Sequence, residues 1–270
     1  MQVSEQLVDD LLDQVRKAEK YAYIAQSLVL EILLEEIPKW KNSKEIIKST
    51  RNKLHQVGSA FQQPNIPYNQ WMDKISSPDG VIDSQSTKAF IIECLRFHAS
   101  TAERQPFLDS FFTETLAPIQ PVESILDLAC GFTPLCLPWM PVTRDISYTG
   151  VDIYSDMISF LDSFYTRYKI NHQFFTGNIL DSIPQQKTQV TFLLKTIPCL
   201  EQVDKTIGRR LLDEIRSENI LVSFPSRSLG GKSKGMAVNY QNHFDQLVEG
   251  RNWHITKTEF ANEIAFLIQK

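Results

Sequence analysis

The second half of the chain alternates between short apolar runs and longer stretches with helical spacing. Apolar runs of strand length occur at 124–129, 147–153, 172–176, 190–194 and 220–224. The stretches between them, including 156–168 and 205–216, repeat apolar residues every three or four positions. Parallel strands need a long crossover, so this alternation predicts an α/β fold with a parallel sheet and helices on both faces. Two closing runs, 253–258 and 263–268, predict an antiparallel hairpin.

The first part of the chain has a purely helical texture. Apolar residues at helical spacing follow Ser4 and continue to Pro38, and a third helix is expected at 43–57. Prolines interrupt 61–80, and helical texture then returns at 87–97 and 103–116. We therefore expect three parts, a helical N-terminal domain, a second helical segment and a Rossmann-like domain, at 1–80, 81–121 and 122–270.

Composition excludes several classes of protein. A chain of 270 residues with 42% hydrophobic content can fill a core without disulfide or metal staples. The four cysteines form no CxxC pair and no cluster with histidine, so we expect reduced cysteines and no metal site. No apolar run is long enough to span a membrane and no signal peptide is evident, which predicts a cytoplasmic protein. Nothing in the sequence demands a dimer, so we expect a monomer.

The first predicted strand ends in a turn that suits a nucleoside. Gly131 allows a tight turn beside a ligand, and Asp152 ends the next strand, where its carboxylate can accept hydrogen bonds from ribose hydroxyls. A nicotinamide dinucleotide would need Gly-x-Gly-x-x-Gly, whereas Gly131 is followed by Phe132, Thr133 and Pro134. The pattern therefore favours S-adenosylmethionine, with a merely structural turn as the alternative.

Several longer sequence motifs strengthen this interpretation. They are HASTAER at 98–104, ILDLACG at 125–131, LLKTIPCLE at 193–201, VSFPSRSLGGKSKG at 222–235 and, in the helical part, TRNKLH at 50–55. In these motifs the chain resembles the aminoglycoside-resistance 16S rRNA methyltransferases that modify N7 of guanine 1405. The resemblance implies a class I S-adenosylmethionine-dependent methyltransferase fold, an all-helical N-terminal domain, S-adenosylhomocysteine as product and the 30S subunit as partner.

The resemblance also implies a set of cofactor-binding residues. They are Phe61, His98, Ala99, Ser100, Arg104, Ala129, Gly131, Asp152, Ile153, Asn178, Ile179 and Leu194. Arg104 is expected to bind the cofactor carboxylate through its guanidinium fork, and its alternative is a surface arginine paired with Glu103 or Asp109. Phe61 stands where the family usually has tyrosine. Asn178 stands where an acid commonly meets the adenine amino group, with Asp181 as a second candidate.

Methylation at a guanine N7 needs no general base, because its lone pair is free at neutral pH. Catalysis then consists of positioning an extruded base against the methyl group. We expect Lys195 to contact that base or its flanking phosphate. Residues that could stack on the base or shape its pocket, or else simply pack at strand ends, are Phe132, Pro198, Phe224 and Pro225.

Two basic clusters point to RNA in a chain whose net charge is −4. Lys44, Lys48 and Arg51 recur on one face of the third helix, with His55 following and Lys53 nearby. A second cluster follows the fifth strand: Arg227, Lys232 and Lys234. Solvated surfaces are the alternative for both clusters. The other functions that remain open are methylation of another RNA base or a small molecule, and RNA binding by a catalytically silent module.

Overall fold

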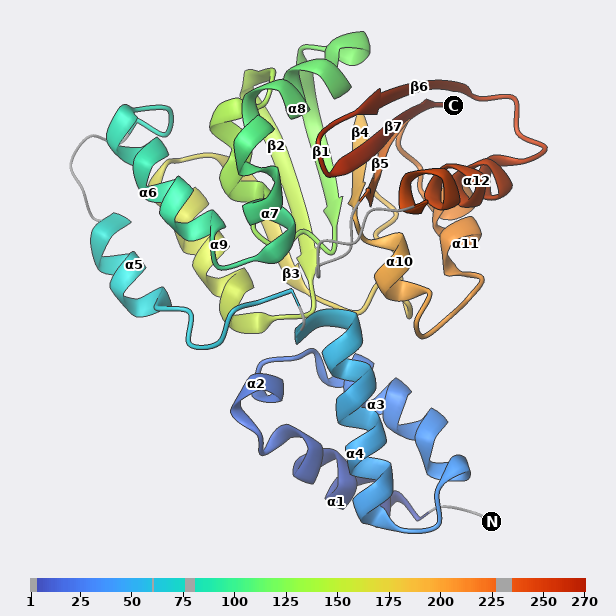
Figure 1. Ribbon diagram of the computed structural model, residues 1–270. Helices are drawn as coiled ribbons and strands as arrows, with labels where there is room; N and C mark the ends of the chain where they lie inside the picture. Colours follow the sequence, from blue (N-terminus) through green and yellow to red (C-terminus); the bar gives the residue numbers. More distant parts are fainter. Residues whose placement is uncertain (1–3, 60, 76–80, 227–234) are drawn as a thin grey trace.

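The computed structural model describes residues 4–59, 61–75, 81–226 and 235–270. Its centre is a seven-stranded sheet with the order β3-β2-β1-β4-β5-β7-β6 (Figure 1). The strands are β1 (Val122–Leu128), β2 (Val142–Asp152), β3 (Asn171–Thr176), β4 (Val190–Leu194), β5 (Asn219–Pro225), β6 (His254–Glu259) and β7 (Glu263–Gln269). β1 to β5 pair in parallel, and β7 runs antiparallel to both β5 and β6. The predicted parallel sheet and closing hairpin are confirmed.

Burial explains why these strands could be predicted from apolar runs in the sequence. Every residue of β4 is buried, as are the last four residues of β1 and the first six of β5 and β7. A strand covered on both faces reads as a continuous apolar run rather than an alternating one. The strand order reverses between β1 and β4, and that reversal places a ligand site at the carboxyl ends of the neighbouring strands.

Helices surround the sheet (Figure 1). The elements on the side of β3 are α5 (Tyr68–Ile75), α6 (Gln85–Leu95), α7 (Ala99–Arg104) and α9 (Ser155–Arg167), and α5 packs on α9, which packs on β3. α8 (Leu108–Thr115) packs against β6 and β7. The elements that follow β4 are α10 (Ile197–Leu200), α11 (Ile207–Glu214) and α12 (Met236–Val248), with α12 against β5.

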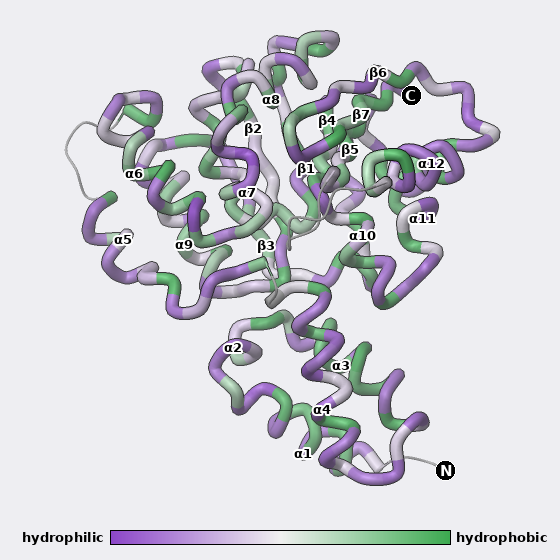
Figure 2. The backbone as a smooth tube through the Cα atoms, viewed as in Figure 1, coloured by the Kyte–Doolittle hydropathy of each residue, from purple (hydrophilic) through white to green (hydrophobic). Residues whose placement is uncertain are grey.

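The first helices form a lobe below the carboxyl ends of the strands (Figure 1). This helical lobe consists of α1 (Glu5–Arg16), α2 (Glu19–Ala22), α3 (Gln26–Glu36) and α4 (Ser43–Leu54). The Ser4 and Asn42 side chains cap α1 and α4 by accepting hydrogen bonds from backbone N–H groups. Along α1 and α4 hydrophilic and hydrophobic residues alternate (Figure 2), and the hydrophobic ones fill the interior of the lobe.

The structure differs from the predicted elements at a few places with identifiable causes. The expected helix 103–116 is broken into α7 and α8 by a 3₁₀ turn (Gln105–Phe107) that contains Pro106. Residues Thr133–Trp139 after β1 form a 3₁₀ helix, and α4 ends at Leu54 in a π turn. Sequence patterning also missed α12, whose described residues are mostly exposed or half-buried. Among the described residues, no helix is long and apolar enough to cross a membrane.

Candidate cofactor site and RNA-binding surface

A cavity opens at the carboxyl ends of β1, β2, β3 and β4. Most of the predicted cofactor residues line it, together with Lys195: Phe61, His98, Ser100, Ala129, Asp152, Ile153, Asn178, Ile179 and Leu194. The helical lobe and the turn after it contribute Leu28, Val57 and Gly58 to the same wall. The cavity is therefore lined by both parts of the molecule, and of the N-terminal contributors the sequence indicated Phe61 but not Leu28, Val57 or Gly58.

Asp152 is an acid in the lining of this cavity. Its Oδ2 accepts a hydrogen bond from the Gly131 N–H at 2.9 Å, and its Oδ1 accepts from the backbone of Ile153 at 2.7 Å and Tyr154 at 3.3 Å. Burial raises the pKa of Asp152 to about 6 even though these hydrogen bonds oppose the shift. The carboxylate is thus held in a fixed orientation at the end of β2, where ribose hydroxyls can donate to it.

Gly131 forms the expected tight turn, and its closest neighbour is a side chain of the protein. Its φ is +51°, and a Cβ at this position would lie 2.8 Å from the imidazole ring of His98. The close approach that requires glycine is therefore made by His98, and Gly131 stands behind that ring rather than in the lining of the cavity. The Ala99 side chain is also absent from the lining, and its backbone N–H donates to the Phe61 carbonyl at 2.7 Å.

The imidazole of His98 faces the cavity as a neutral group. Burial, together with the positive charges of Arg104 and Lys195, lowers its pKa to about 4. Its Nδ1 is buried and makes no hydrogen bond within the described part of the chain. A neutral imidazole with a free buried nitrogen can accept or donate one hydrogen bond to a ligand, depending on its tautomer.

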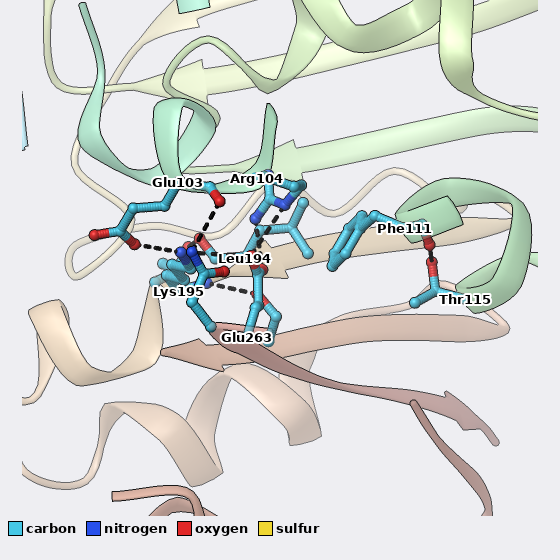
Figure 3. A network of polar contacts seen from close by, with 10 residues as sticks. Glu103, Arg104, Phe111, Thr115, Leu194, Lys195 and Glu263 are labelled. Carbon is cyan, nitrogen blue, oxygen red and sulfur yellow. Dashed lines mark hydrogen bonds and ion pairs between the residues drawn. The ribbon is translucent and has the colours of Figure 1, made fainter. Parts of the chain in front are cut away.

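Arg104 and Glu263 form a fully buried ion pair beside the cavity (Figure 3). Nε of Arg104 lies 3.1 Å from Oε2 of Glu263, and Nη2 lies 2.6 Å from Oε1. The alternative of a surface arginine paired with Glu103 or Asp109 is excluded, because Arg104 is fully buried and pairs with Glu263. Glu263 occupies Nε and Nη2 of the guanidinium, and the contact of Arg104 with a cofactor carboxylate stays a prediction. Nη1 is buried without a partner among the described residues, and Arg104 is not among the residues that line the cavity.

Lys195 lies at the cavity wall with its ammonium group engaged (Figure 3). Its Nζ is 2.7 Å from Oε2 of Glu103 and 3.4 Å from Oε2 of Glu263, and only 6% of its side chain is exposed. The expectation that Lys195 contacts the target base or its flanking phosphate stays a prediction. To reach RNA, the ammonium would have to leave Glu103, whose side chain is 30% exposed.

Glu263 links these groups and was missed in the sequence. Its carboxylate also accepts a hydrogen bond from the Ser223 hydroxyl at 2.6 Å. The nearby positive charges of Arg104 and Lys195, with these hydrogen bonds, hold its pKa below the ordinary value despite burial. A carboxylate at the first position of an otherwise apolar strand was the available signal, because a fully buried acid requires partners.

Asn178 lies at the end of the cavity near β3. Its Nδ2 donates to Oε2 of Glu31 on α3 at 2.6 Å, and its Oδ1 accepts from the Leu180 N–H at 3.1 Å. Sequence reasoning did not identify Glu31. Asp181, the second candidate acid at this end, is exposed and does not line the cavity.

The predicted basic face of α4 is only partly available to a partner. Lys44 and Lys48 are exposed. Arg51 instead donates to the backbone carbonyls of α1, reaching Gln14 O at 2.6 Å, and Lys53 forms ion pairs with Glu35 and Glu36 at 2.8 and 3.1 Å. Assigning Arg51 and Lys53 to an open RNA-binding face was therefore wrong, because both side chains bind within the helical lobe.

The remaining residues expected to contact RNA or the target base lie outside the described ranges, in the core or at half-buried positions. The second basic cluster, Arg227, Lys232 and Lys234, lies outside the described residues. Phe132 and Phe224 are fully buried in the core, so the alternative of ordinary packing holds for them, whereas Pro198 and Pro225 are half-buried. No group of His, Cys, Asp and Glu side chains that could hold a metal ion occurs in the described ranges.

The chain has relatives that match nearly all of its length. Residues 17–268 match the family model described as ribosomal RNA methyltransferase (FmrO). A 16S rRNA (guanine(1405)-N(7))-methyltransferase from Micromonospora echinospora is 31% identical over 98% of both chains. A protein of the same name from Micromonospora rosea is 30% identical over 97% of both chains.

A solved structure shows the same architecture. The crystal structure of the 16S rRNA methyltransferase RmtF in complex with S-adenosyl-L-homocysteine matches with a TM-score of 0.83, covers 99% of each chain and shares 24% sequence identity. The expected Rossmann-like methyltransferase fold with a helical N-terminal region is confirmed by this match. With the family model and the relatives above, it leads to one conclusion: the chain belongs to the ribosomal RNA methyltransferase (FmrO) family.

Proposed function

We propose that the protein transfers the methyl group of S-adenosylmethionine to N7 of guanine 1405 of 16S rRNA in the 30S subunit. The relatives that carry this activity in their names support the target base. The observation that carries the cofactor assignment is the position of Asp152 in one cavity with His98, whose Nδ1 is buried and has no partner in the described part of the chain. Methylation at that position gives resistance to aminoglycosides such as kanamycin and gentamicin, which is the physiological role we propose.

The groups in the cavity fit the parts of this cofactor. Asp152 accepts the ribose hydroxyls at the end of β2, and Asn178 with Ile179 holds the adenine beside β3. At the other end, Nη1 of Arg104 donates one hydrogen bond to the carboxylate of the methionine part, and neutral His98 bonds its polar groups. Leu194 and Lys195 then line the side that faces the target base.

The reaction needs positioning more than proton transfer. The cofactor supplies a methyl group on a sulfonium, which is electrophilic without further activation. The N7 lone pair attacks that carbon in line, the carbon–sulfur bond breaks, and the positive charge passes to the purine with no proton lost. Glu103 and Glu263 place negative charge beside Lys195, so the wall of the site is not strongly positive where a cationic base forms.

We propose that residues 1–80 act as an RNA-docking domain, that 81–121 completes the cofactor site and that 122–270 carries the chemistry. Lys44 and Lys48 on α4 supply exposed positive charge for phosphate contacts. A folded ribosomal substrate is recognised by shape as well as by sequence, which a separate lobe can provide. The protein works as a monomer in the cytoplasm, where its ribosomal substrate is found.

A methyl-transfer assay tests the proposal directly. Radiolabelled S-adenosylmethionine is offered with intact 30S subunits, free 16S rRNA or a pool of small molecules. We expect label in 30S subunits alone, and chemical cleavage at 7-methylguanine should map it to position 1405. Label at another nucleotide or only in the small-molecule pool would refute the target. Cofactor binding without any transfer would identify an RNA-binding module instead.

A further inference from the structure

One acid of the helical lobe, Glu31, contacts Asn178 in the lining of the cavity. Glu31 lies on α3, and its Oε2 is 2.6 Å from Nδ2 of Asn178, a residue 147 positions later in the chain. The backbone of the lobe is bonded to the adjacent loop, with Ala25 N–H donating to Ile153 O at 2.7 Å and Ser155 N–H donating to Tyr23 O at 2.9 Å. Glu31 is therefore held at this place by several contacts rather than by one side chain.

The two partners of Asn178 fix the orientation of its amide. A carboxylate can only accept hydrogen bonds, so the group facing Glu31 must be the NH₂. The Leu180 N–H donates to the other side of the amide, which must therefore be the oxygen. Asn178 is buried in this arrangement, and one lone pair on Oδ1 is left without a partner in the described contacts.

Asn178 lies where the base of a nucleoside would lie if Asp152 bound its ribose. Asp152 ends β2 and meets the ribose, so the base lies toward the neighbouring strand β3, which is followed by Asn178 and Ile179. Adenine carries an amino group on its exposed edge, and that group must find an acceptor when it is buried. An oriented amide oxygen with a free lone pair meets this requirement, and the carboxylate behind the amide polarises it further.

We propose that Glu31 is a positioning residue of the methyl-donor site, which orients and polarises Asn178 so that Oδ1 accepts the adenine amino group. The inference rests on the proposed function, because it presumes an adenosine cofactor in this cavity. The negative charge that favours binding of the adenine amino group thus comes from Glu31 in the helical lobe, and not from a residue that follows β3. Cofactor affinity then depends on the docking of that lobe.

An exchange of the two groups tests this pair. In Asn178→Asp, two carboxylates would lie where the present contact is 2.6 Å, and S-adenosylhomocysteine affinity should fall about 30-fold. In the double variant Glu31→Gln with Asn178→Asp, the amide of the new glutamine can donate to the new aspartate. We expect its affinity, measured by calorimetry, to return to within about threefold of the wild type. Glu35→Gln on the same helix is the matched control, because Glu35 pairs with Lys53.

Comparing the affinities of two ligands distinguishes a positioning role of Glu31 from a general structural role. S-Inosylhomocysteine has a carbonyl oxygen in place of the adenine amino group, so the wild type should prefer the adenosine compound by about 30-fold. Glu31→Ala should reduce this preference to below about fivefold, whereas a loosened lobe would weaken both ligands equally. The ratio is measured on one preparation and does not depend on the fraction folded.

The possible outcomes have separate meanings. Recovery in the double variant together with a reduced preference in Glu31→Ala would support the inference. An unchanged preference in Glu31→Ala, or a double variant no better than Asn178→Asp alone, would overturn it. If the wild type failed to bind S-adenosylhomocysteine at all, the proposed function itself would be refuted.

Discussion

The guanidinium of Arg104 and the carboxylate of Glu263 face each other in a fully buried pair, 159 residues apart in the chain. The Arg104 guanidinium also lies 4.3 Å above the ring of Phe111 (Figure 3). Removing one member of a buried pair leaves an uncompensated charge, which costs more than the pair itself contributes. This arrangement therefore gives Arg104 a role in stability and leaves Nη1 as the group that we propose contacts the cofactor.

Replacing Glu263 by alanine should reduce stability strongly. Both Arg104 and Lys195 would lose a buried partner, and we expect the free energy of unfolding in urea to fall by about 3–5 kcal/mol. Glu259→Ala is the control, since its ion pair with Lys257 is exposed and should contribute less than about 1 kcal/mol. Equal effects of the two substitutions would contradict the role assigned to the buried pair.

Arg104→Lys should separate the cofactor contact from the ion pair. A lysine can still pair with Glu263 but lacks Nη1, so affinity for S-adenosylhomocysteine should fall by about tenfold or more. 5′-Methylthioadenosine has no carboxylate, and calorimetry should find its affinity nearly unchanged. Parallel losses for both ligands would show that Arg104 does not act on the carboxylate end.

Cofactor binding should weaken in mild acid because of Asp152. Burial raises the pKa of this carboxyl to about 6, and ribose hydroxyls donate best to its ionised form. As pH falls below 6, the protonated form dominates and affinity for S-adenosylhomocysteine should decrease by about tenfold per pH unit. Asp152→Asn should bind weakly at every pH. A wild-type affinity that stays constant between pH 7 and pH 5 would refute this dependence.

The lobe should lose stability in acid through Glu36. Hydrogen bonds from Ser49 and its other partners, acting against burial, lower its pKa from 4.5 to about 2. The ionised form is thus favoured in the folded state, so its contribution is complete above pH 4.5 and is lost as pH falls toward 2. Glu36→Gln should destabilise the protein at pH 7 and progressively less below pH 4.5. Urea unfolding of both proteins at several pH values measures this difference, and a constant difference would contradict it.

Substitutions on α4 should affect ribosome binding without affecting the cofactor. Lys44→Glu with Lys48→Glu reverses two exposed charges, and 30S affinity at low salt should fall by about tenfold or more while S-adenosylhomocysteine affinity stays unchanged. Lys187→Glu changes an exposed lysine that pairs with Glu218 outside the lobe and serves as the control. Unaltered 30S affinity in the α4 variant would exclude this face from docking. Arg51 is unsuitable for the test, because it bonds to the backbone of α1.

The strands and the cavity residues were predictable because their signals are local. A strand buried on both faces is apolar along most of its length, and β4 has the predicted bounds Val190–Leu194. The turn at Gly131 and the acid at Asp152 follow strand ends, and strand ends converge at one edge of the sheet. By contrast, α12 escaped prediction because Phe244 and Leu247 are the buried residues among its described positions, too few for a clear apolar stripe.

The sequence by itself determined the order of helices and strands, the type of sheet and the family of the chain. Only the tertiary structure decided which charges meet, pairing Arg104 with Glu263 and Glu31 with Asn178. It also turned Arg51 inward, although helical spacing aligned it with Lys44 and Lys48. The physical reason is that periodicity follows from backbone geometry within one element, whereas the partner of a buried charge depends on how distant elements pack.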